Sequence, residues 1–263
     1  KSLELSFDDF QELNDYASQL NLEFLSSAFD LESFSLLKKL NLKRCKIASG
    51  EINNFPFLRE VSKANLPIIL SSGMSSLSDI EFAINTLIKF GSKKQDITVL
   101  HCVSEYPAPK ESVNLNAMQT IANAFHINTG FSDHTEGIEV AIYASLLGAS
   151  IIEKHLTLDK NLIGPDHSAS IEPEEFKKMT SLIKEAKRIK GDGSKVPSEY
   201  EIKNLDIVRK SVVAKKPIMK GELLSENNLT VKRPGSGISP KYWEKIIGRL
   251  SSKDYSKDDF IEW

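Results

Sequence analysis

Short apolar runs alternate with amphipathic segments of helical length between residues 22 and 190. Six runs are predicted to be strands, at 23–29, 45–49, 68–71, 97–103, 127–131 and 150–155. Helices are predicted near 31–41, 56–64, 75–90, 114–125, 136–147 and 173–190. Such alternation indicates a parallel sheet with helices packed outside it. The strand runs are apolar throughout, as expected for strands that are buried on both faces.

Clusters of polar residues follow five of the six predicted strands. They read SGE, SSGM, SEYP, SDHT and KHL, and each begins where an apolar run stops. In a (β/α)₈ barrel all strands end on one face, which carries the chemistry, whereas a doubly wound sheet gathers its polar groups at one switch point. Six units are compatible with a barrel lacking two strands or with a doubly wound sheet. Because the polar clusters follow five different strands, we predict an α/β fold in which residues 1–190 form a (β/α)₈ TIM barrel.

The character of the chain changes after residue 190. Residues 191–207 begin with GDGSKVPSEY, and this wealth of glycine, serine, proline and charge is typical of a linker. Residues 208–263 hold short strand-like runs separated by turns, which predict a small, mostly β domain. At the other end of the chain, Ser6 precedes acidic residues and is predicted to cap a helix.

Composition narrows the classes of partner. The chain has 34 Lys and Arg against 36 Asp and Glu, so neither nucleic acid nor an anionic membrane surface is expected as a partner. No apolar run approaches the roughly 18 residues that a membrane span needs. Cys45 and Cys102 lie in strand-like runs, which favours reduced core thiols and a cytoplasmic location.

Two histidines follow neighbouring predicted strands, His134 in SDHT and His155 in EKHL. One strand–helix unit separates them, so both imidazoles are expected at the same mouth of the barrel. Two imidazoles suit a divalent ion such as Mn, Fe, Co or Zn and leave positions open for water and substrate. The alternative is that one or both are structural, hydrogen-bonded histidines. Asp133 and Glu153 are candidates to orient the ligands, or ordinary ion-paired carboxylates.

Lysine and serine residues follow other strands and suggest an anion site. Lys46 and Ser49 lie in KIASGE, while Ser71 and Ser132 end two further runs. A lysine is costly to bury unless it meets an anion, and hydroxyls near a glycine complete a phosphate cradle. The alternative is that the serines are caps and turns.

Two further charged residues lie in turns. Asp166 follows the turn Gly164–Pro165 and is placed either to bind a hydroxylated ligand or as a plain turn residue. Arg233 lies in KRPG of the small domain and would matter only if that domain reached the mouth of a barrel.

The motifs together resemble those of the sialic acid synthase family, whose members make N-acetylneuraminate, legionaminate or pseudaminate. The resemblance covers nearly the whole chain and rests on nine segments in order: FLSSAFD, KIASGEINNFP, PIILSSGM, LHCVSEYPAP, VNLNAM, GFSDHTEG, IIEKHLTLDK, GPDHSAS and the tail VVAKKPIMKGE…LTVKRPGSGISP. Each motif alone is weak, but their order and spacing make the set specific.

The resemblance implies a (β/α)₈ barrel followed by an antifreeze-like (SAF) domain, in a homodimer that exchanges the small domains. The implied reaction condenses phosphoenolpyruvate with an amino-sugar aldehyde and releases phosphate. The matching positions are His134 and His155 for Mn²⁺ (Mg²⁺ or Co²⁺ as alternatives), Lys46, Ser49, Ser71 and Ser132 for phosphoenolpyruvate, Glu51, Tyr106 and Asp166 near the acceptor sugar, and Arg233 for its acyl-amino group. Ser104 is a further residue expected to bind substrate. Glu51 and His155 are the residues expected to take part in catalysis.

The chain departs from the family pattern in two places. Family members begin with strands that carry a catalytic glutamate and a phosphate-binding lysine, and neither segment is present, so 23–29 counts as the third strand. An arc that lacks strands one and two has open edges, and we expect this chain to be part of a longer enzyme and inactive alone. Ser104 stands where neuraminate-making members often have asparagine, and SEYPAP looks more like legionaminate-type members.

Three other functions are compatible with parts of the pattern. A synthase of a ulosonic acid from a phosphorylated aldose shares the barrel, but the tail argues against it. A metal-dependent hydrolase would need further His or Asp ligands. A non-catalytic sugar-binding or scaffold protein that keeps the fold would need no metal.

Overall fold

The computed structural model describes residues 5–263 and divides into two compact units. The first unit ends at Gly191 and the second spans Asp192–Trp263. The first four residues of the predicted barrel domain lie outside the described residues. No helix within residues 5–263 combines the length and the apolar character needed to cross a membrane.

The first unit is built on a curled sheet of five parallel strands, in the order β1-β2-β3-β4-β5. The strands are β1 (Cys45–Ile47), β2 (Ile68–Ser71), β3 (Ile97–Cys102), β4 (Asn128–Asp133) and β5 (Ile152–Lys154). Each strand pairs with the next one along the chain. This order is that of consecutive barrel strands, and a doubly wound sheet would reverse it at a switch point. The prediction of a barrel-type α/β fold is therefore confirmed, as a half-barrel of five strands.

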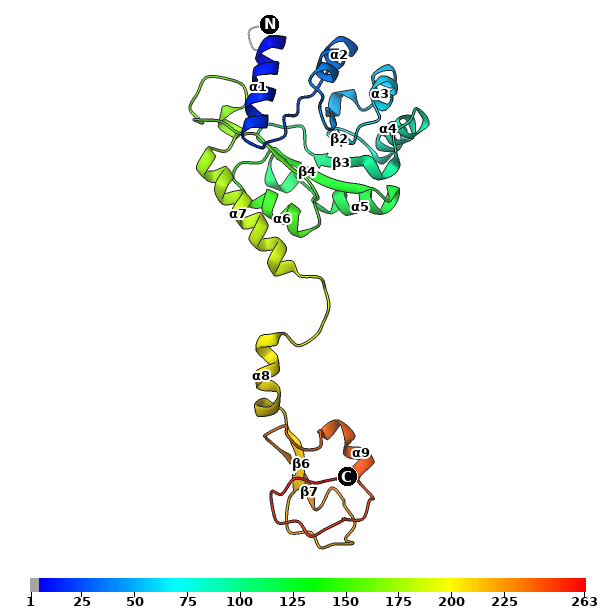
Figure 1. Ribbon diagram of the computed structural model, residues 1–263, viewed down its shortest axis with the longest axis vertical. Coiled ribbons are helices and arrows are strands. Elements are labelled where there is room, and N and C mark those ends of the chain that lie inside the picture. Colours follow the sequence, from blue (N-terminus) through cyan, green and yellow to red (C-terminus); the bar gives the residue numbers. More distant parts are fainter. Residues whose placement is uncertain (1–4) are drawn as a thin grey trace. The chain divides into compact units, whose positions relative to one another are not determined.

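Helices connect the strands and follow one another in an arc around the outside of the sheet (Figure 1). They are α2 (Leu31–Lys39), α3 (Phe55–Ser62), α4 (Leu77–Lys89), α5 (Asn116–Phe125), α6 (Glu139–Leu146) and α7 (Pro173–Lys190). Asp30, Asn54 and Ser76 start three of them by accepting a hydrogen bond from a backbone N–H of the first turn. Short 3₁₀ turns lie at Ser49–Glu51, Lys94–Asp96, Lys110–Ser112 and His167–Ala169.

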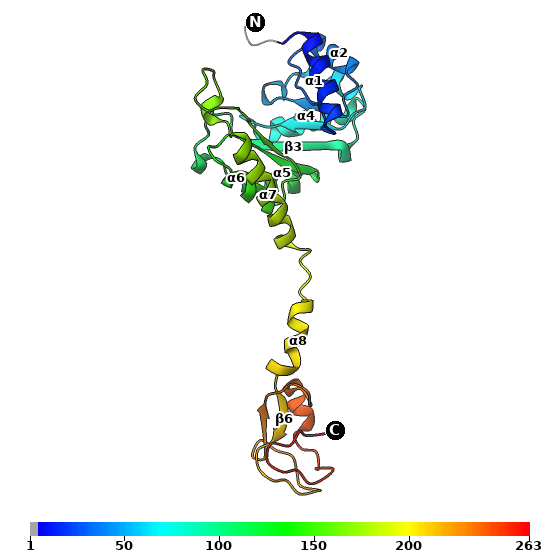
Figure 2. The same cartoon turned by 60° about the vertical axis from the view of Figure 1, so that its left-hand side comes forward.

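Clusters of apolar side chains hold the helices to the sheet. Ile47, Leu70 and Val99 of the strands pack with Leu58 of α3 and Leu87 of α4, and all five are fully buried. Burying each such side chain stabilises the fold by about 1.5–3 kcal/mol. Figure 2 shows α5, α6 and α7 together beneath the sheet. There Phe131 of β4 and Ile152 of β5 pack against α6.

The predicted strand at 23–29 is wrong in the structure. Its pairing with the sheet is a single parallel bridge between Ser27 and Lys46. A segment beside an end strand has hydrogen-bond partners on one side only, and β1 offers it just three residues. Beyond β5, a second parallel bridge joins Leu156 to Ile171.

The N-terminal helix is confirmed as α1 (Phe7–Gln19), and Ser6 caps it. Ser6 and Asp9 form a reciprocal capping box, with the Ser6 hydroxyl accepting from the Asp9 N–H and the Asp9 carboxylate accepting from the Ser6 N–H. Phe7 and Phe10 pack at the edge of the first apolar cluster. Cys45 and Cys102 are both free and buried, as expected for core thiols.

The second unit contains more helix than the sequence predicted. Part of the expected linker, 191–207, forms α8 (Glu199–Val208), because Ser198 and Glu201 make a capping box that starts a helix. The antiparallel pair of β6 (Ser211–Ala214) and β7 (Leu229–Lys232) follows. A 3₁₀ turn, Pro240–Tyr242, and a short helix, α9 (Trp243–Ile246), complete the elements of the unit (Figure 1). The small core is formed by Val212, Ala214, Ile218, Leu224, Leu229, Ile238, Ile246, Tyr255 and Ile261.

Candidate active site at the carboxyl ends of the strands

β4 and β5 end in three consecutive cross-strand positions. The register pairs Ser132 with Glu153 and Asp133 with Lys154. His134 directly follows β4, and His155 directly follows β5. Because successive side chains of a strand point to opposite faces, Ser132, Glu153 and the two histidines share one face. The two histidine rings lie 5.4 Å apart between centroids and are nearly perpendicular, at 87°. The structure therefore brings the two predicted metal ligands together.

His134 is held from the neighbouring strand. Its Nδ1 lies 2.6 Å from the backbone oxygen of Val103, and its own backbone oxygen accepts from the Ala108 N–H at 2.9 Å. Because a carbonyl can only accept, Nδ1 carries the proton and Nε2 keeps a free lone pair. Burial lowers the pKa of His134, and nearby His155 lowers it further, against the opposing effect of the Val103 hydrogen bond. The ring is therefore poised as a neutral ligand.

Tyr106 and Asp166 complete the surroundings of the histidines. The Tyr106 ring lies 4.2 Å from the His134 ring and 5.4 Å from the His155 ring, between centroids. Burial, together with Cys102 and carboxylates that include Asp166, raises the pKa of Tyr106, so its hydroxyl keeps its proton. Asp166 Oδ2 lies 3.8 Å from His155 Nδ1. Both predicted residues thus lie at the mouth beside the histidines.

A chain of polar contacts joins His134 to Lys46. Ser132 Oγ lies 3.2 Å from His134 Nε2 and donates to Glu153 Oε1 at 2.7 Å. The other oxygen of Glu153 lies 3.5 Å from Lys46 Nζ, which donates to Ser71 Oγ at 2.8 Å. The Lys46 side chain is only 8% exposed. The lysine and two of the predicted serines are therefore linked to His134 by consecutive contacts.

Ser49 and Ser104 gather around Gly73, at the end of β2. Ser49 Oγ accepts from the Gly73 N–H at 2.9 Å and lies 3.4 Å from Cys102 Sγ. A Cβ at Gly73 would overlap the Ser104 hydroxyl oxygen, so the two residues are in close contact. This cluster adds hydroxyl groups beside the Lys46 position.

Two further predicted residues, Glu51 and Arg233, have surroundings that do not test their roles. The Glu51 carboxylate accepts from Asn54 Nδ2 at 2.6 Å, next to the start of α3, so its contact is local. Arg233 follows β7 in the second unit and is joined to Pro234 by a cis peptide bond. Their catalytic and acceptor-binding roles stay predictions.

Comparison with known proteins identifies the family. The sequence model of the NeuB family matches residues 1–195, and that of the SAF domain matches residues 209–263. The chain belongs to the NeuB family.

Relatives of this NeuB-family chain carry the names of sugar-acid synthases. The N,N'-diacetyllegionaminic acid synthase of Campylobacter jejuni is 51% identical over 261 residues, which are 99% of this chain and 78% of the relative. The enzyme of the same name from Legionella pneumophila is 42% identical over 265 residues, 100% and 74% of the two chains. The crystal structure of a putative spore coat polysaccharide biosynthesis protein E from Chromobacterium violaceum matches with a TM-score of 0.84 at 25% identity, over 98% of this chain and 77% of that one. These relatives favour a sugar-acid synthase over a hydrolase.

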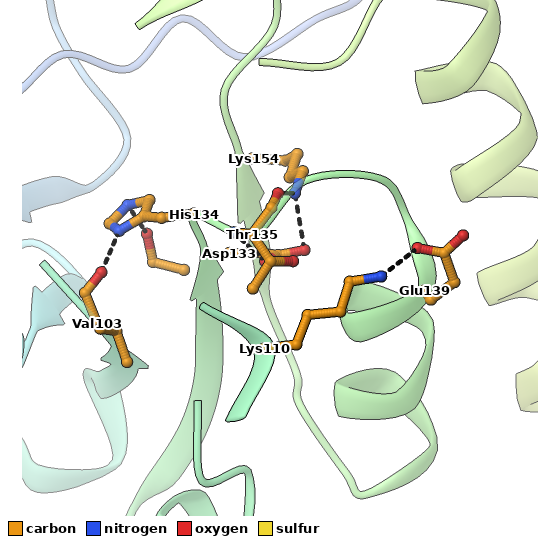
Figure 3. A network of polar contacts seen from close by, with 8 residues as sticks. Val103, Lys110, Asp133, His134, Thr135, Glu139 and Lys154 are labelled. Atoms are coloured by element: carbon orange, nitrogen blue, oxygen red, sulfur yellow. Dashed lines mark hydrogen bonds and ion pairs between the residues drawn. The ribbon is translucent and has the colours of Figure 1, made fainter. Parts of the chain in front are cut away.

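Sequence reasoning missed one partner in this NeuB-family site, Lys154. Its Nζ lies 2.9 Å from Asp133 Oδ2, and the two side chains are 1% and 0% exposed. Asp133 therefore belongs to an ion pair with Lys154 (Figure 3). Of the two candidate carboxylates, Glu153 is the one that contacts Ser132 on the face of the histidines. The sequence carries a usable signal, because Asp133 and Lys154 each precede a histidine and must point to the opposite face.

The donor set fits a divalent metal held by two ligands. Within residues 5–263, no group of three or more His, Cys, Asp or Glu side chains is arranged to hold a metal ion. The two imidazoles lie side by side, and the Val103 carbonyl fixes the proton of His134 on Nδ1, which leaves the lone pair on Nε2. Such a pair suits a borderline divalent ion that keeps its other positions for water and substrate.

Proposed function

We propose that this chain carries the active site of an enzyme that condenses phosphoenolpyruvate with an N-acylated mannosamine-type or 6-deoxy-diacetamido hexose to a nonulosonic acid, with release of phosphate. The observation that carries the proposal is the continuous set of contacts from His134 through Glu153 to the buried Lys46. It combines two imidazoles and an anion site within one strand-end face. The 51% identity to a legionaminic acid synthase and the SEYPAP loop favour the diacetamido hexose as acceptor.

Lys46 and the serines are proposed to bind the phosphate and carboxylate of phosphoenolpyruvate. Lys46 is almost fully buried, and Ser71 and Glu153 occupy two of the three N–H donors of its ammonium, which leaves one for a phosphate oxygen. The Ser71 hydroxyl accepts from Lys46, so its own proton is free to reach a phosphate oxygen. Ser49 and Ser104 around Gly73 supply further hydroxyl groups.

His134 and His155 are proposed to hold the divalent ion, Mn²⁺ with Mg²⁺ or Co²⁺ as alternatives. Bound there, the ion would polarise the aldehyde oxygen of the acceptor sugar. Tyr106 is proposed to contact the sugar, and Asp166 to accept a hydrogen bond from one of its hydroxyls; both lie beside the histidines, which supports these roles.

The proposed reaction forms one carbon–carbon bond and one carbon–oxygen bond and breaks one carbon–oxygen bond. C3 of phosphoenolpyruvate bonds to the aldehyde carbon, and water adds at C2. One proton of that water balances the proton taken up by the aldehyde oxygen, and the other leaves with phosphate as the tetrahedral C2 collapses to a ketone. Glu51 is the residue of this chain proposed to stabilise the developing charge at C2 or to direct the water.

The assembly and location are proposed from the family resemblance. We infer a cytoplasmic homodimer in which Arg233 of the partner subunit reaches the acyl-amino group of the acceptor. Replacing Arg233 by Ala should then raise the KM for the sugar more than the KM for phosphoenolpyruvate. Equal effects on both would contradict the role.

The direct test is phosphate release by the full-length protein, given phosphoenolpyruvate, Mn²⁺ and a panel of acylated mannosamine-type and diacetamido hexoses. We expect release with one class of sugar, and its loss on chelation of the metal and in the His155→Ala variant. Absence of phosphate release with every sugar, from folded protein that binds sugar, would favour a sugar-binding scaffold. Turnover by His155→Ala without bound metal would refute the ligand assignment.

A further inference from the structure

Asp133 and Lys154 form the last cross-strand pair before the two histidines. They face each other in the register of β4 and β5, and each strand ends at its member of the pair. Beyond this point no further backbone ladder position joins the two strands. His134 and His155 are therefore carried by chain that the sheet itself no longer aligns.

The Lys154 ammonium holds the backbone on both sides of His134. It binds Asp133 Oδ2, one residue before the histidine, at 2.9 Å, and donates to the Thr135 carbonyl, one residue after it, at 2.5 Å. Asp133 Oδ1 accepts from the Thr135 N–H and hydroxyl at 2.9 and 2.8 Å (Figure 3). Lys154, the residue before His155, thus closes a ring of contacts around the segment from Asp133 to Thr135 that carries His134.

The pair is placed on the helix-covered face, away from the site. Phe131 and Ile152 precede it on the same face and pack with α6, and Ile152 also packs with residues of α7. Both charges are fully buried. A well-packed apolar pair is often as stable as a buried ion pair, so stability alone does not account for the ring of directed contacts around His134.

We propose that Asp133 and Lys154 are positioning residues that set the spacing and orientation of His134 and His155 as metal ligands. The inference rests on the proposed function, in which the two histidines hold the divalent ion. Partners outside the ligand shell orient ligands, and losing them typically weakens metal affinity about 10–100-fold. The pair acts through the backbone, since it touches neither imidazole.

A double variant separates positioning from stability. Lys154→Met alone leaves the Asp133 carboxylate buried without its partner and should lower the melting temperature. Adding Asp133→Asn removes that stranded charge and should restore most of the melting temperature. Mn²⁺ affinity, measured on the full-length protein from the free-ion EPR signal, should remain weakened about 10–100-fold in the double variant.

Recovery of wild-type Mn²⁺ affinity together with the melting temperature would overturn the inference, since the pair would then be only structural. Should the double variant not fold, Thr135→Val carries the test, because it removes only the hydroxyl that Asp133 accepts. Its matched control is Thr135→Ser, which keeps that hydroxyl and should bind Mn²⁺ like the wild type. Equal affinity in Thr135→Val and Thr135→Ser would overturn the inference in that case.

The same measurement distinguishes the two levels of proposal. A wild-type protein that binds no Mn²⁺, or a His155→Ala variant that binds it unchanged, contradicts the metal site itself and the inference with it. The positioning role alone is contradicted by a different set of results. In that case the wild type binds Mn²⁺, the His155→Ala variant does not, and the double variant binds Mn²⁺ like the wild type.

Discussion

Gly73 and Ser104 are in such close contact that a Cβ on Gly73 would overlap the Ser104 hydroxyl oxygen. The same Cβ would lie 2.9 Å from Ser49 Oγ. The absence of a side chain at Gly73, just beyond β2, thus leaves room for two neighbouring hydroxyls, which would have to rotate away from a Cβ.

Gly73→Ala should displace the Ser104 and Ser49 hydroxyls that are proposed to bind phosphate. Because serine side chains can rotate, the loss of stability should stay near the lower end, about 1 kcal/mol, of what overpacking costs. Chemical denaturation gives the free energy, and the KM for phosphoenolpyruvate reports the displacement. Gly50→Ala is the matched control, because a Cβ at Gly50 meets nothing within 4 Å. Equal stability of the two variants would contradict the crowding argument. Adding Ser104→Gly to Gly73→Ala should recover part of the lost stability.

The buried pair Lys154–Asp133 and the exposed pair Lys110–Glu139 provide a second contrast. Removing one partner of a buried pair costs about 3–5 kcal/mol because the other charge stays buried. Lys154→Met should therefore lower the free energy of unfolding by about that much. Lys110 and Glu139 are 58% and 51% exposed, at 3.4 Å, and Lys110→Met should change stability by at most about 1 kcal/mol. Urea denaturation of both variants measures the two losses in free energy of unfolding. Similar losses would show that burial does not determine how much the Lys154–Asp133 pair contributes to stability.

Lys46→Met should impair binding of phosphoenolpyruvate. The substitution keeps most of the side-chain volume and removes the ammonium that contacts Ser71 and Glu153. A hydrogen bond to a charged group contributes about 1.5–3 kcal/mol, so kcat/KM for phosphoenolpyruvate should fall about 10–100-fold. Lys39→Met, at an exposed position of α2, is the control. If kcat/KM fell for the sugar and stayed unchanged for phosphoenolpyruvate, the proposed role of Lys46 in binding phosphoenolpyruvate would be contradicted.

Cys45 makes stability depend on alkaline pH. Burial raises the pKa of its thiol to about 11 from the ordinary value of 9.0. Between these two values the unfolded chain releases the thiol proton and the folded state keeps it. The contribution of Cys45 to the free energy of unfolding is therefore complete below pH 9 and is lost as the pH rises through 11. The loss is on the order of 2 kcal/mol. Urea midpoints from pH 8 to 11 should therefore fall more steeply in the wild type than in Cys45→Ala. Parallel curves would show that Cys45 does not contribute.

The linear sequence determined most of the local structure and the main candidates of the site. Runs such as 68–71 and 97–103 are apolar throughout because they lie inside a covered parallel sheet, and they became β2 and β3. Capping residues such as Ser6 and Ser76 act within one turn of a helix, so their effect can be predicted from neighbouring residues. The positions of His134 and His155 after neighbouring strands were sufficient to predict that the rings meet.

Only the tertiary structure decided which side chains pair across strands. The Ser132–Glu153 and Lys154–Asp133 contacts depend on the register of β4 against β5, which no local pattern specifies. The segment at 23–29 has a strand-like composition, yet it forms one bridge, because a strand requires a partner along its whole length. Local periodicity determines what each segment can form, but hydrogen bonds and ion pairs between distant residues exist only once the sheet has set their spacing.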